Sequence, residues 1–209
     1  MLTTTLPHAT PDQAIIGLDN PSWIRRAILI EQVAETYAEG TFTPAQRRQA
    51  EDLFRIALYD HEPLARRVLA DSLKRLTGVP RDIVLSLALD EAQVARPILR
   101  RSPVLDDDDL VERARESTRA HRQAIAERDG LSAKVAQALC ESRDAQVIRS
   151  LVANETAALP EALLHGILDA LEHVPGIVET MARRRRLPVS VANRLAWRSA
   201  PGRAAARRA

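Results

Sequence analysis

The sequence predicts an all-α protein, and three observations on the 209-residue chain support this fold class. Hydrophobic residues make up 45% of the chain but aromatic residues only 3%, so Leu, Ala, Val and Ile must fill the core. Seven glycines are few for a protein built on tight β-turns. Apolar residues recur at helical spacing, and similar segments recur along the chain.

The chain length fits one helical domain with less ordered ends. Residues 1–20 contain Pro7, Pro11 and several threonines, and we expect this segment to be irregular and flexible. Residues 199–209 are rich in arginine and alanine, and we expect a flexible tail there. The helical domain is therefore expected to span residues 21–198.

The first two helices have recognisable ends. We expect one helix from about Pro21 to Glu39, because proline is favourable in a first turn and Gly40 stops the helix. A second helix is expected after Thr43, which is a good N-cap and is followed by Pro44. Together these two helices form the first predicted hairpin.

Beyond this hairpin the sequence repeats itself. Asp60–Leu69 aligns with Asp90–Leu99 at an offset of 30 residues, and Glu91–Leu99 aligns with Asp144–Val152 at an offset of 53. We expect Asp60, Asp90 and Asp144 to cap the helices that follow them. After each aspartate comes an apolar pair one turn apart that is expected to face a neighbouring helix: Leu64 and Val68, Val94 and Ile98, and Val147 and Leu151.

Short helices of this kind do not persist alone in water, so each must be covered by its neighbours. Recurring units that shelter one another are typical of stacked helical repeats. The sequence therefore predicts an α-solenoid of HEAT-like helical hairpin repeats, with about ten helices.

A family resemblance lies in the same region. The segment Ala88–Leu110, which reads ALDEAQVARPILRRSPVLDDDDL, resembles a bacterial family of HEAT-like helical proteins known as domain of unknown function 2336. The resemblance continues through His121–Ala126, Arg128–Leu131, Val135–Leu139 and Asn154, and it spans residues 24–198. It implies an α-solenoid-like fold, and it brings no established reaction, cofactor or catalytic residue.

Positive charge is concentrated at the C-terminal end. Residues 183–209 contain nine arginines and no acidic residue, so residues 1–182 carry a net charge of −7 beneath the overall +2. Such a run can bind nucleic acid or an anionic membrane surface. It can equally be a solvated cationic terminus, and Trp197 is the only aromatic residue available for base stacking.

Arginines also recur within the aligned helices. Arg66, Arg96 and Arg149 occupy the same aligned position, and in a HEAT-like stack equivalent residues form a column that can hold an anionic ligand. The alternative, which we favour, is that each arginine pairs with the capping aspartate of a neighbouring repeat. The binding hypothesis covers two groups of arginines: Arg66, Arg96 and Arg149, and the run Arg183, Arg184, Arg185 and Arg186.

Catalytic and metal-binding motifs are not recognisable. The acidic run Asp106–Asp109 lacks the spacing of a calcium loop and is interpreted as the acidic first turn of a helix. No two of the five histidines stand four residues apart, and Cys140 has no second cysteine as a partner. Glycine-rich phosphate loops and nucleophile motifs are also missing, so we expect no catalytic residue, no metal and no cofactor.

The expected function is therefore non-enzymatic. We expect a scaffold or adaptor that binds a protein partner through its repeat surface; the alternative is a nucleic-acid-associated protein that uses the C-terminal and inner-helix arginines. No apolar run approaches the roughly 20 residues of a transmembrane helix, and the N-terminus lacks the pattern of a signal peptide. A single cysteine suits a reducing compartment, so a cytoplasmic location is expected.

Overall fold

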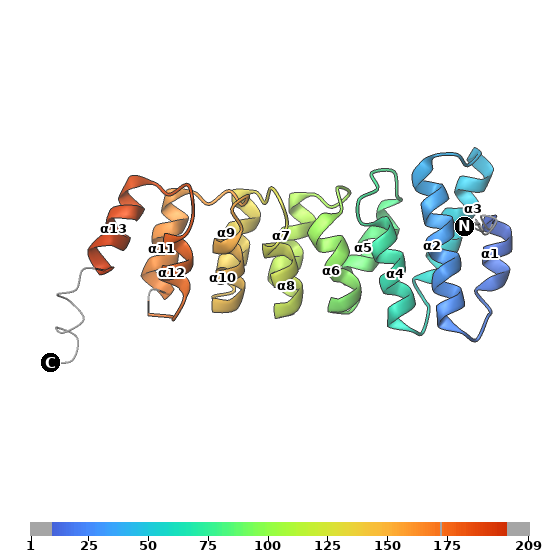
Figure 1. Ribbon diagram of the computed structural model, residues 1–209, viewed down its shortest axis with the longest axis horizontal. Helices are drawn as coiled ribbons and strands as arrows, with labels where there is room; N and C mark the ends of the chain where they lie inside the picture. The colour runs from blue at the N-terminus through green and yellow to red at the C-terminus, as the bar shows by residue number, and fades with distance from the viewer. Residues whose placement is uncertain (1–9, 172, 200–209) are drawn as a thin grey trace, which may run out of the picture. The chain divides into compact units, whose positions relative to one another are not determined.

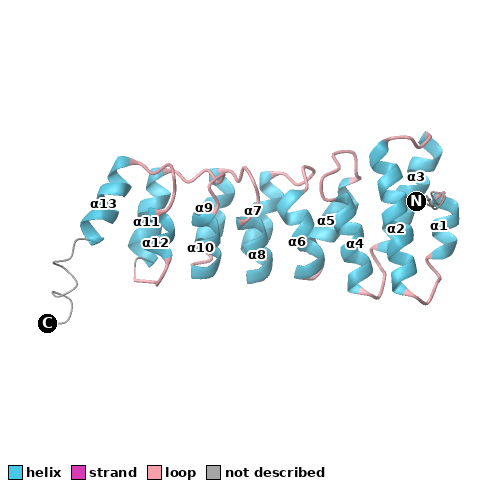
Figure 2. Ribbon diagram, viewed as in Figure 1, coloured by secondary structure: helices cyan, strands magenta, loops and turns pink. Residues whose placement is uncertain are grey.

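The structure, a computed structural model, describes residues 10–171 and 173–199. Within these residues every regular element is an α-helix, and no strand is present (Figures 1 and 2). The expected all-α class is confirmed. Contacts group the chain into two compact units, Met1–Asp106 and Asp107–Ala209, each of which is described by itself.

Unit 1 holds six helices: α1 (Pro11–Gly17), α2 (Trp23–Glu39), α3 (Pro44–Ala57), α4 (Pro63–Leu73), α5 (Arg81–Leu89) and α6 (Ala92–Arg101). Helices α2, α4 and α6 pack against one another in that order and form one layer. Helix α3 contacts α2 and α4, and α5 contacts α4 and α6, so the odd-numbered helices cover this layer from one side. Leu53, Phe54, Leu69 and Leu87 are among the fully buried residues of unit 1.

The ends of α2 and α3 follow from local sequence. Gly40 closes α2 in the left-handed conformation, with a φ of 71°. Thr43 caps α3 by accepting a hydrogen bond from the backbone N–H of Gln46, whose own side chain accepts one from the N–H of Thr43. Both predicted boundaries are confirmed, except that α2 begins at Trp23 rather than Pro21.

The N-terminal segment differs from the expectation. We expected irregular chain over residues 1–20, but residues 11–17 form α1. Thr10 and Gln13 make a capping box, Pro11 occupies the first turn, and Ala14 is buried against the helices of unit 1. Residues 1–9 lie outside the described part of the chain, as do residues 200–209 of the expected tail.

Unit 2 holds seven helices: α7 (Asp107–Glu116), α8 (Arg119–Ala126), α9 (Ala133–Glu141), α10 (Ala145–Ala153), α11 (Glu161–Leu171), α12 (Ile177–Ala182) and α13 (Val189–Ser199). Helices α8, α10 and α12 pack side by side, while α7 packs on α9 and α11 packs on α13. The C-terminal half of unit 2 is closed by a cluster of buried residues that includes Val152, Leu168, Met181 and Val191.

The prediction that three aspartates cap helices is partly confirmed. Asp144 caps α10 and accepts hydrogen bonds from the backbone N–H groups of Gln146 and Val147. Glu62 and Glu91 hold the N-cap positions of α4 and α6, so Asp60 and Asp90 stand two residues and one residue earlier. Their carboxylates accept hydrogen bonds from the N–H groups of those two glutamates.

One of the expected apolar pairs is wrong. Leu64 is 39% exposed, and the buried residues of α4 are Ala65, Leu69, Ala70 and Leu73. The reason is register: α4 begins three residues after Asp60, whereas α6 begins two residues after Asp90. The pairs in α6 and α10 are buried as expected.

Among the residues that the structure describes, no helix combines the length and the apolar character needed to cross a bilayer.

Candidate functional site

Two arginines of the α2–α4–α6 layer, Arg26 and Arg66, form ion pairs with aspartates that precede the next helix of the layer. Arg66 of α4 donates from Nε and Nη2 to the two carboxylate oxygens of Asp90, at 2.6 and 2.8 Å. Its Nη1 donates to the carbonyl oxygen of Asp60 at 2.7 Å. These contacts match the structural interpretation of Arg66, because all three guanidinium nitrogens are engaged within unit 1.

Arg26 of α2 makes the same contacts one helix earlier. It binds Asp60 at 2.6 and 2.7 Å and reaches the carbonyl oxygen of Asn20 at 2.7 Å. Both side chains of the Arg26–Asp60 pair are only 4% exposed. Burial disfavours the charged form of Asp60, but the hydrogen bonds from Arg26 and from the Glu62 N–H outweigh it and hold the pKa of Asp60 below its ordinary 3.8.

Sequence reasoning missed Arg26, although a signal for it exists. Asn20 and Arg26 have the same six-residue separation as Asp60 and Arg66, but the aspartate is replaced by asparagine. Arg149 was expected to be equivalent to Arg66, yet its Nη2 donates to the carbonyl oxygen of Pro175 at 2.7 Å. In unit 2 it is Arg119 that pairs with a capping aspartate, Asp144.

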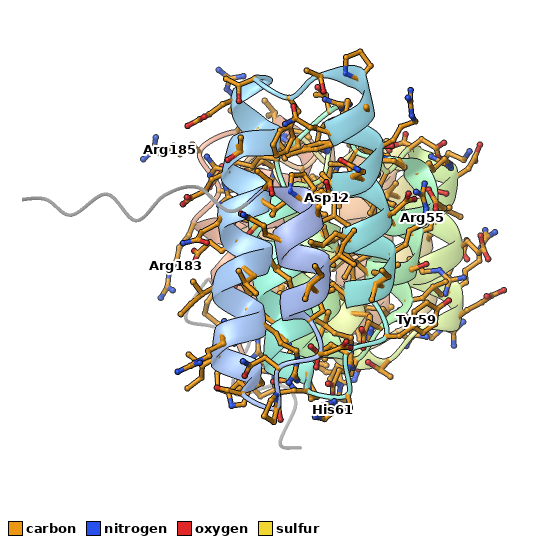
Figure 3. All side chains as sticks on the ribbon, turned by 90° about the vertical axis from the view of Figure 1, so that its right-hand side faces the viewer. Asp12, Arg55, Tyr59, His61, Arg183 and Arg185 are labelled. Atoms are coloured by element: carbon orange, nitrogen blue, oxygen red, sulfur yellow. The ribbon has the colours of Figure 1, made fainter. Side chains whose placement is uncertain are left out.

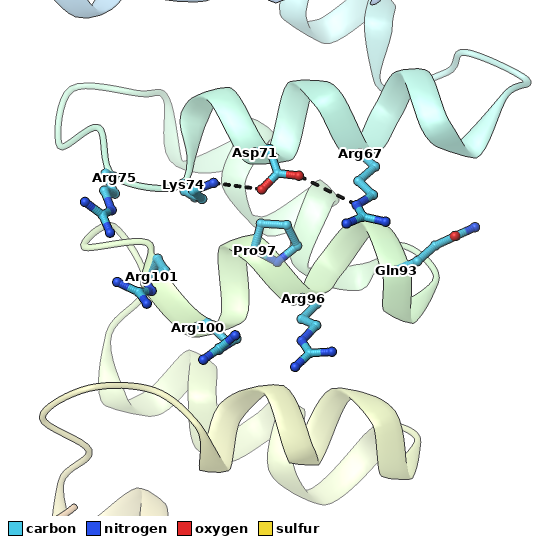
Figure 4. Close-up of a pocket in the computed structure, with 9 residues that line it drawn as sticks. All are labelled: Arg67, Asp71, Lys74, Arg75, Gln93, Arg96, Pro97, Arg100 and Arg101. Carbon is cyan, nitrogen blue, oxygen red and sulfur yellow. Dashed lines mark hydrogen bonds and ion pairs between the residues drawn. The ribbon is translucent and has the colours of Figure 1, made fainter. Parts of the chain in front are cut away.

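The α4–α6 face of unit 1 carries a cationic groove with a volume of about 480 Å³. Figure 4 shows the side chains that line it, which come from the two helices and from the turn after α4. The groove is lined by six cationic residues and one acidic residue, together with Gln93 and Pro97: Arg67, Lys74, Arg75, Arg96, Arg100, Arg101 and Asp71.

Asp71 pairs with two of these cationic residues. Its carboxylate binds Nζ of Lys74 at 2.8 Å and lies 3.6 Å from Nε of Arg67 (Figure 4). Arg67 is in the same helix as Asp71, and Lys74 stands directly after the last residue of that helix. Arg75 is exposed and makes no ion pair within the described residues. Arg96, which the sequence singled out, lines this groove, whereas Arg66 does not.

An acidic groove adjoins the cationic one. It lies between α2 and α4, has a volume of about 420 Å³, and contains Glu31 and Glu35. Asp71 and Lys74 line both grooves, so the two surfaces are continuous in unit 1. The layer formed by α2, α4 and α6 therefore presents opposite charges within one connected surface.

The family is shown by a sequence match. The model of a protein family described as an uncharacterised protein conserved in bacteria (DUF2336) matches residues 94–207, which is more than half of the chain. The chain belongs to this family. Neither a curated protein nor a solved structure matches the chain.

The DUF2336 match is shorter at the N-terminal side than the resemblance expected over residues 24–198. It begins at residue 94 in α6 and runs through every helix of unit 2. The segment around Ala95–Leu110, which carried part of the resemblance, lies within it. In the cationic groove, the part of α6 from residue 94 onwards therefore lies within the DUF2336 match, and Gln93 and α4 lie outside it.

Inside the DUF2336 match, the four-arginine run divides into two kinds of residue. Arg184 donates to the carbonyl oxygens of Val152 and Asn154, both at 2.8 Å, and to that of Ala157 at 3.3 Å. It thus satisfies carbonyls at the C-terminal end of α10. The exposed residues of the run are Arg183, Arg185 and Arg186, and Figure 3 shows the side chains of the first two directed into solvent.

The acidic run contributes to a helix start. Asp107, Asp108 and Asp109 form the first turn of α7, where the helix dipole favours negative charge. Asp108 pairs with Lys134 of α9. Within residues 10–171 and 173–199, no group of three or more His, Cys, Asp or Glu side chains is arranged to hold a metal ion.

A Ser–His–Glu cluster in the DUF2336 match was not expected from the sequence. His165 Nε2 lies 3.0 Å from Ser190 Oγ, and Ser190 donates a hydrogen bond to Glu161. In a nucleophilic triad the acid instead binds the second imidazole nitrogen and orients the ring. Here Nδ1 of His165 lies 3.4 Å from a guanidinium nitrogen of Arg194, so the cluster does not have the geometry of a triad.

Proposed function

We propose that the chain is a non-enzymatic helical-repeat scaffold that binds an acidic segment of a protein partner in the cationic groove of unit 1. In this proposal the helices form HEAT-like hairpins of an α-solenoid. The observation that carries the function is the groove between α4 and α6, in which six cationic side chains accompany one carboxylate.

Two features support the repeat architecture. Within each unit, helices alternate between two layers. A helix packs on the helix two places further along the chain, as α2 does on α4 and α8 does on α10. Arg26 and Arg66 use the same atoms to reach the next aspartate along unit 1, so two consecutive hairpins are joined in the same way. Recurring contacts between neighbouring units are the basis of solenoid stability.

Charge and geometry favour an acidic ligand. Guanidinium groups bind carboxylates through directional, paired hydrogen bonds, and several of them line one groove here. Every residue that lines the groove except Pro97 is polar or charged, which suits a polar partner. Arg67, Arg75 and Arg96 are exposed, so a ligand can reach them.

A protein segment fits this surface better than a nucleic acid. The adjoining groove with Glu31 and Glu35 would repel a phosphate backbone that continued across α4 towards α2. The described lining of the cationic groove contains no aromatic side chain on which a base could stack. A peptide whose acidic residues are followed by basic ones would complement both grooves.

The proposal is tested with a fluorescently labelled octaglutamate peptide and the full chain, using fluorescence anisotropy at about 50 mM salt, where screening is weak. We expect saturable binding that weakens as salt rises. The double variant Arg67→Glu/Arg75→Glu should weaken it by roughly tenfold or more, since it reverses two charges in the groove.

The matched control is Arg25→Glu/Arg48→Glu, which makes the same charge change in unit 1 at two exposed arginines outside the groove. It should bind the peptide within a factor of two or so of the unmodified chain. Equal losses in the two double variants, or no saturable binding at all, would overturn the proposal. Tighter binding of a labelled single-stranded oligonucleotide than of octaglutamate would favour the nucleic-acid alternative instead.

A further inference from the structure

Unit 2 contains a pocket of different character from the cationic groove. It has a volume of about 500 Å³ and lies among α9, α10 and α11. Its walls are mostly apolar and include the side chains of Cys140, Ile148, Leu163, Ile167 and Leu171. Small-molecule sites in proteins have volumes of roughly 300–1,000 Å³ and are predominantly apolar with few polar groups.

Gly166 keeps this pocket open. It lies in the middle of α11, where glycine is less favourable than any residue except proline. A Cβ atom at this position would have no atom within 4 Å, so no close packing contact requires a glycine. Any larger side chain at residue 166 would instead project into the space that the pocket provides.

Arg143 supplies the charge at the rim. It occupies the turn between α9 and α10 with a φ of 51°, the only positive φ at a non-glycine residue in the described chain. Its side chain is exposed and lines the pocket, and it makes no ion pair or hydrogen bond within the described residues. The one carboxylate in the lining, Glu141, is already bound by Arg115 at 3.0 Å.

We propose that this pocket binds a small amphipathic anion, with an apolar chain among α9, α10 and α11 and a carboxylate on Arg143. Charge complementarity selects the anionic head, because the Arg143 side chain has no ion-pair partner among the residues that the structure describes. The apolar walls select a hydrocarbon body. This site is separate from the groove of unit 1 and does not rest on the function proposed for that groove.

The test uses decanoate and the full chain in isothermal titration calorimetry. We expect one saturable site, and octanoate should bind more weakly because each buried methylene contributes roughly fourfold in affinity. Gly166→Leu fills the pocket with a good helix former and should weaken decanoate binding more than about tenfold. Ala162→Leu, at an exposed position of α11 outside the pocket, is the matched control and should bind as the unmodified chain does.

A second comparison isolates the headgroup. Arg143→Gly retains the left-handed turn, because glycine adopts a positive φ without strain. This variant should lose roughly tenfold in affinity for decanoate and none for uncharged decanol. Absence of saturable decanoate binding, undiminished binding by Gly166→Leu, or equal losses for decanoate and decanol in Arg143→Gly would overturn the proposal. Thermal melting followed by circular dichroism checks that each variant is folded.

Discussion

Arg66 and Asp90 lie 24 residues apart and form a two-point ion pair with distances of 2.6 and 2.8 Å. The same arginine donates to the carbonyl oxygen of Asp60, six residues before it. Arg66 therefore connects the start of its own helix to the start of the next helix in the layer. Since Arg26 repeats this arrangement with Asn20 and Asp60, unit 1 contains two consecutive links of one kind.

Removing the arginine of a link should destabilise the protein according to how deeply the pair is buried. Arg26→Ala should lower the free energy of unfolding by about 3–5 kcal/mol, because it leaves the buried Asp60 carboxylate without its partner. Arg66→Ala should cost about 1–3 kcal/mol, since its pair is 16% and 17% exposed. Urea denaturation measures both values.

The control for this series is Arg55→Ala. Arg55 pairs with Asp82 between α3 and α5, but the two side chains are 41% and 58% exposed. An exposed pair of this kind contributes about 0–1 kcal/mol. A loss at Arg55 as large as that at Arg26 would contradict the role assigned to burial.

Acid should weaken unit 1 through Asp60. Its folded pKa lies below the ordinary 3.8, so its ionised form stabilises the fold above about pH 4, and this contribution is lost as the pH falls through the folded pKa. Asp60→Asn should therefore be less stable than the unmodified chain at pH 7, and the difference should shrink below pH 4. Denaturation curves at several pH values measure it, with Asp19→Asn at an exposed position as the control. A difference that stayed constant to pH 2 would argue against this linkage.

Replacing each of two adjacent arginines by alanine should change the stability of the protein by very different amounts. Arg184→Ala removes a charged donor from three carbonyl oxygens near the end of α10 and should cost about 1.5–3 kcal/mol of stability. Arg185→Ala removes the same charge from an exposed side chain and should change stability by no more than about 0.5 kcal/mol. Thermal or chemical denaturation distinguishes them, and equal effects would show that Arg184 does not act as a cap.

Two glycines of unit 2 should respond oppositely to alanine. Gly176 has a φ of 86°, and a Cβ there would lie 3.2 Å from Nε of Arg149, so Gly176→Ala should destabilise the protein by about 1 kcal/mol or more. Gly166 lies inside α11 with space around it, and Gly166→Ala should stabilise by about 0.4–1 kcal/mol. Melting temperatures of the two variants test the pair, and a shift of the same sign in both would refute it.

Features that depend on neighbouring residues could be predicted from the sequence. Thr43 and Gly40 mark helix ends because their effects are local, and both boundaries agree with the structure. The pairing of Arg66 with a capping aspartate was also the favoured interpretation, because both residues recur in aligned segments. Helix α1 was not predicted, since seven residues carry little periodic signal and their stability comes from packing on α2 and α3.

Features that depend on register between helices could not be predicted. Leu64 follows the apolar pattern of its repeat, but a one-residue difference in where α4 begins turns it towards solvent. The cationic groove needs side chains from α4 and α6 together, and the sequence identified only Arg96 among them. The rim position of Arg143 likewise depends on a left-handed backbone conformation, which an arginine in the sequence does not indicate.

The link between Arg66 and Asp90 has a direction: the donor lies on the earlier helix of the layer, and the acceptor lies just before the start of the later one. Residues 60–89 therefore begin with Asp60, which accepts hydrogen bonds from the arginine of the preceding helix in the layer. They also contain Arg66, which donates hydrogen bonds to the aspartate at residue 90. A tandem copy of this 30-residue stretch would supply both groups in the correct places. The number of hairpins in unit 1 can thus grow by internal duplication, without a compensating substitution at the new junction.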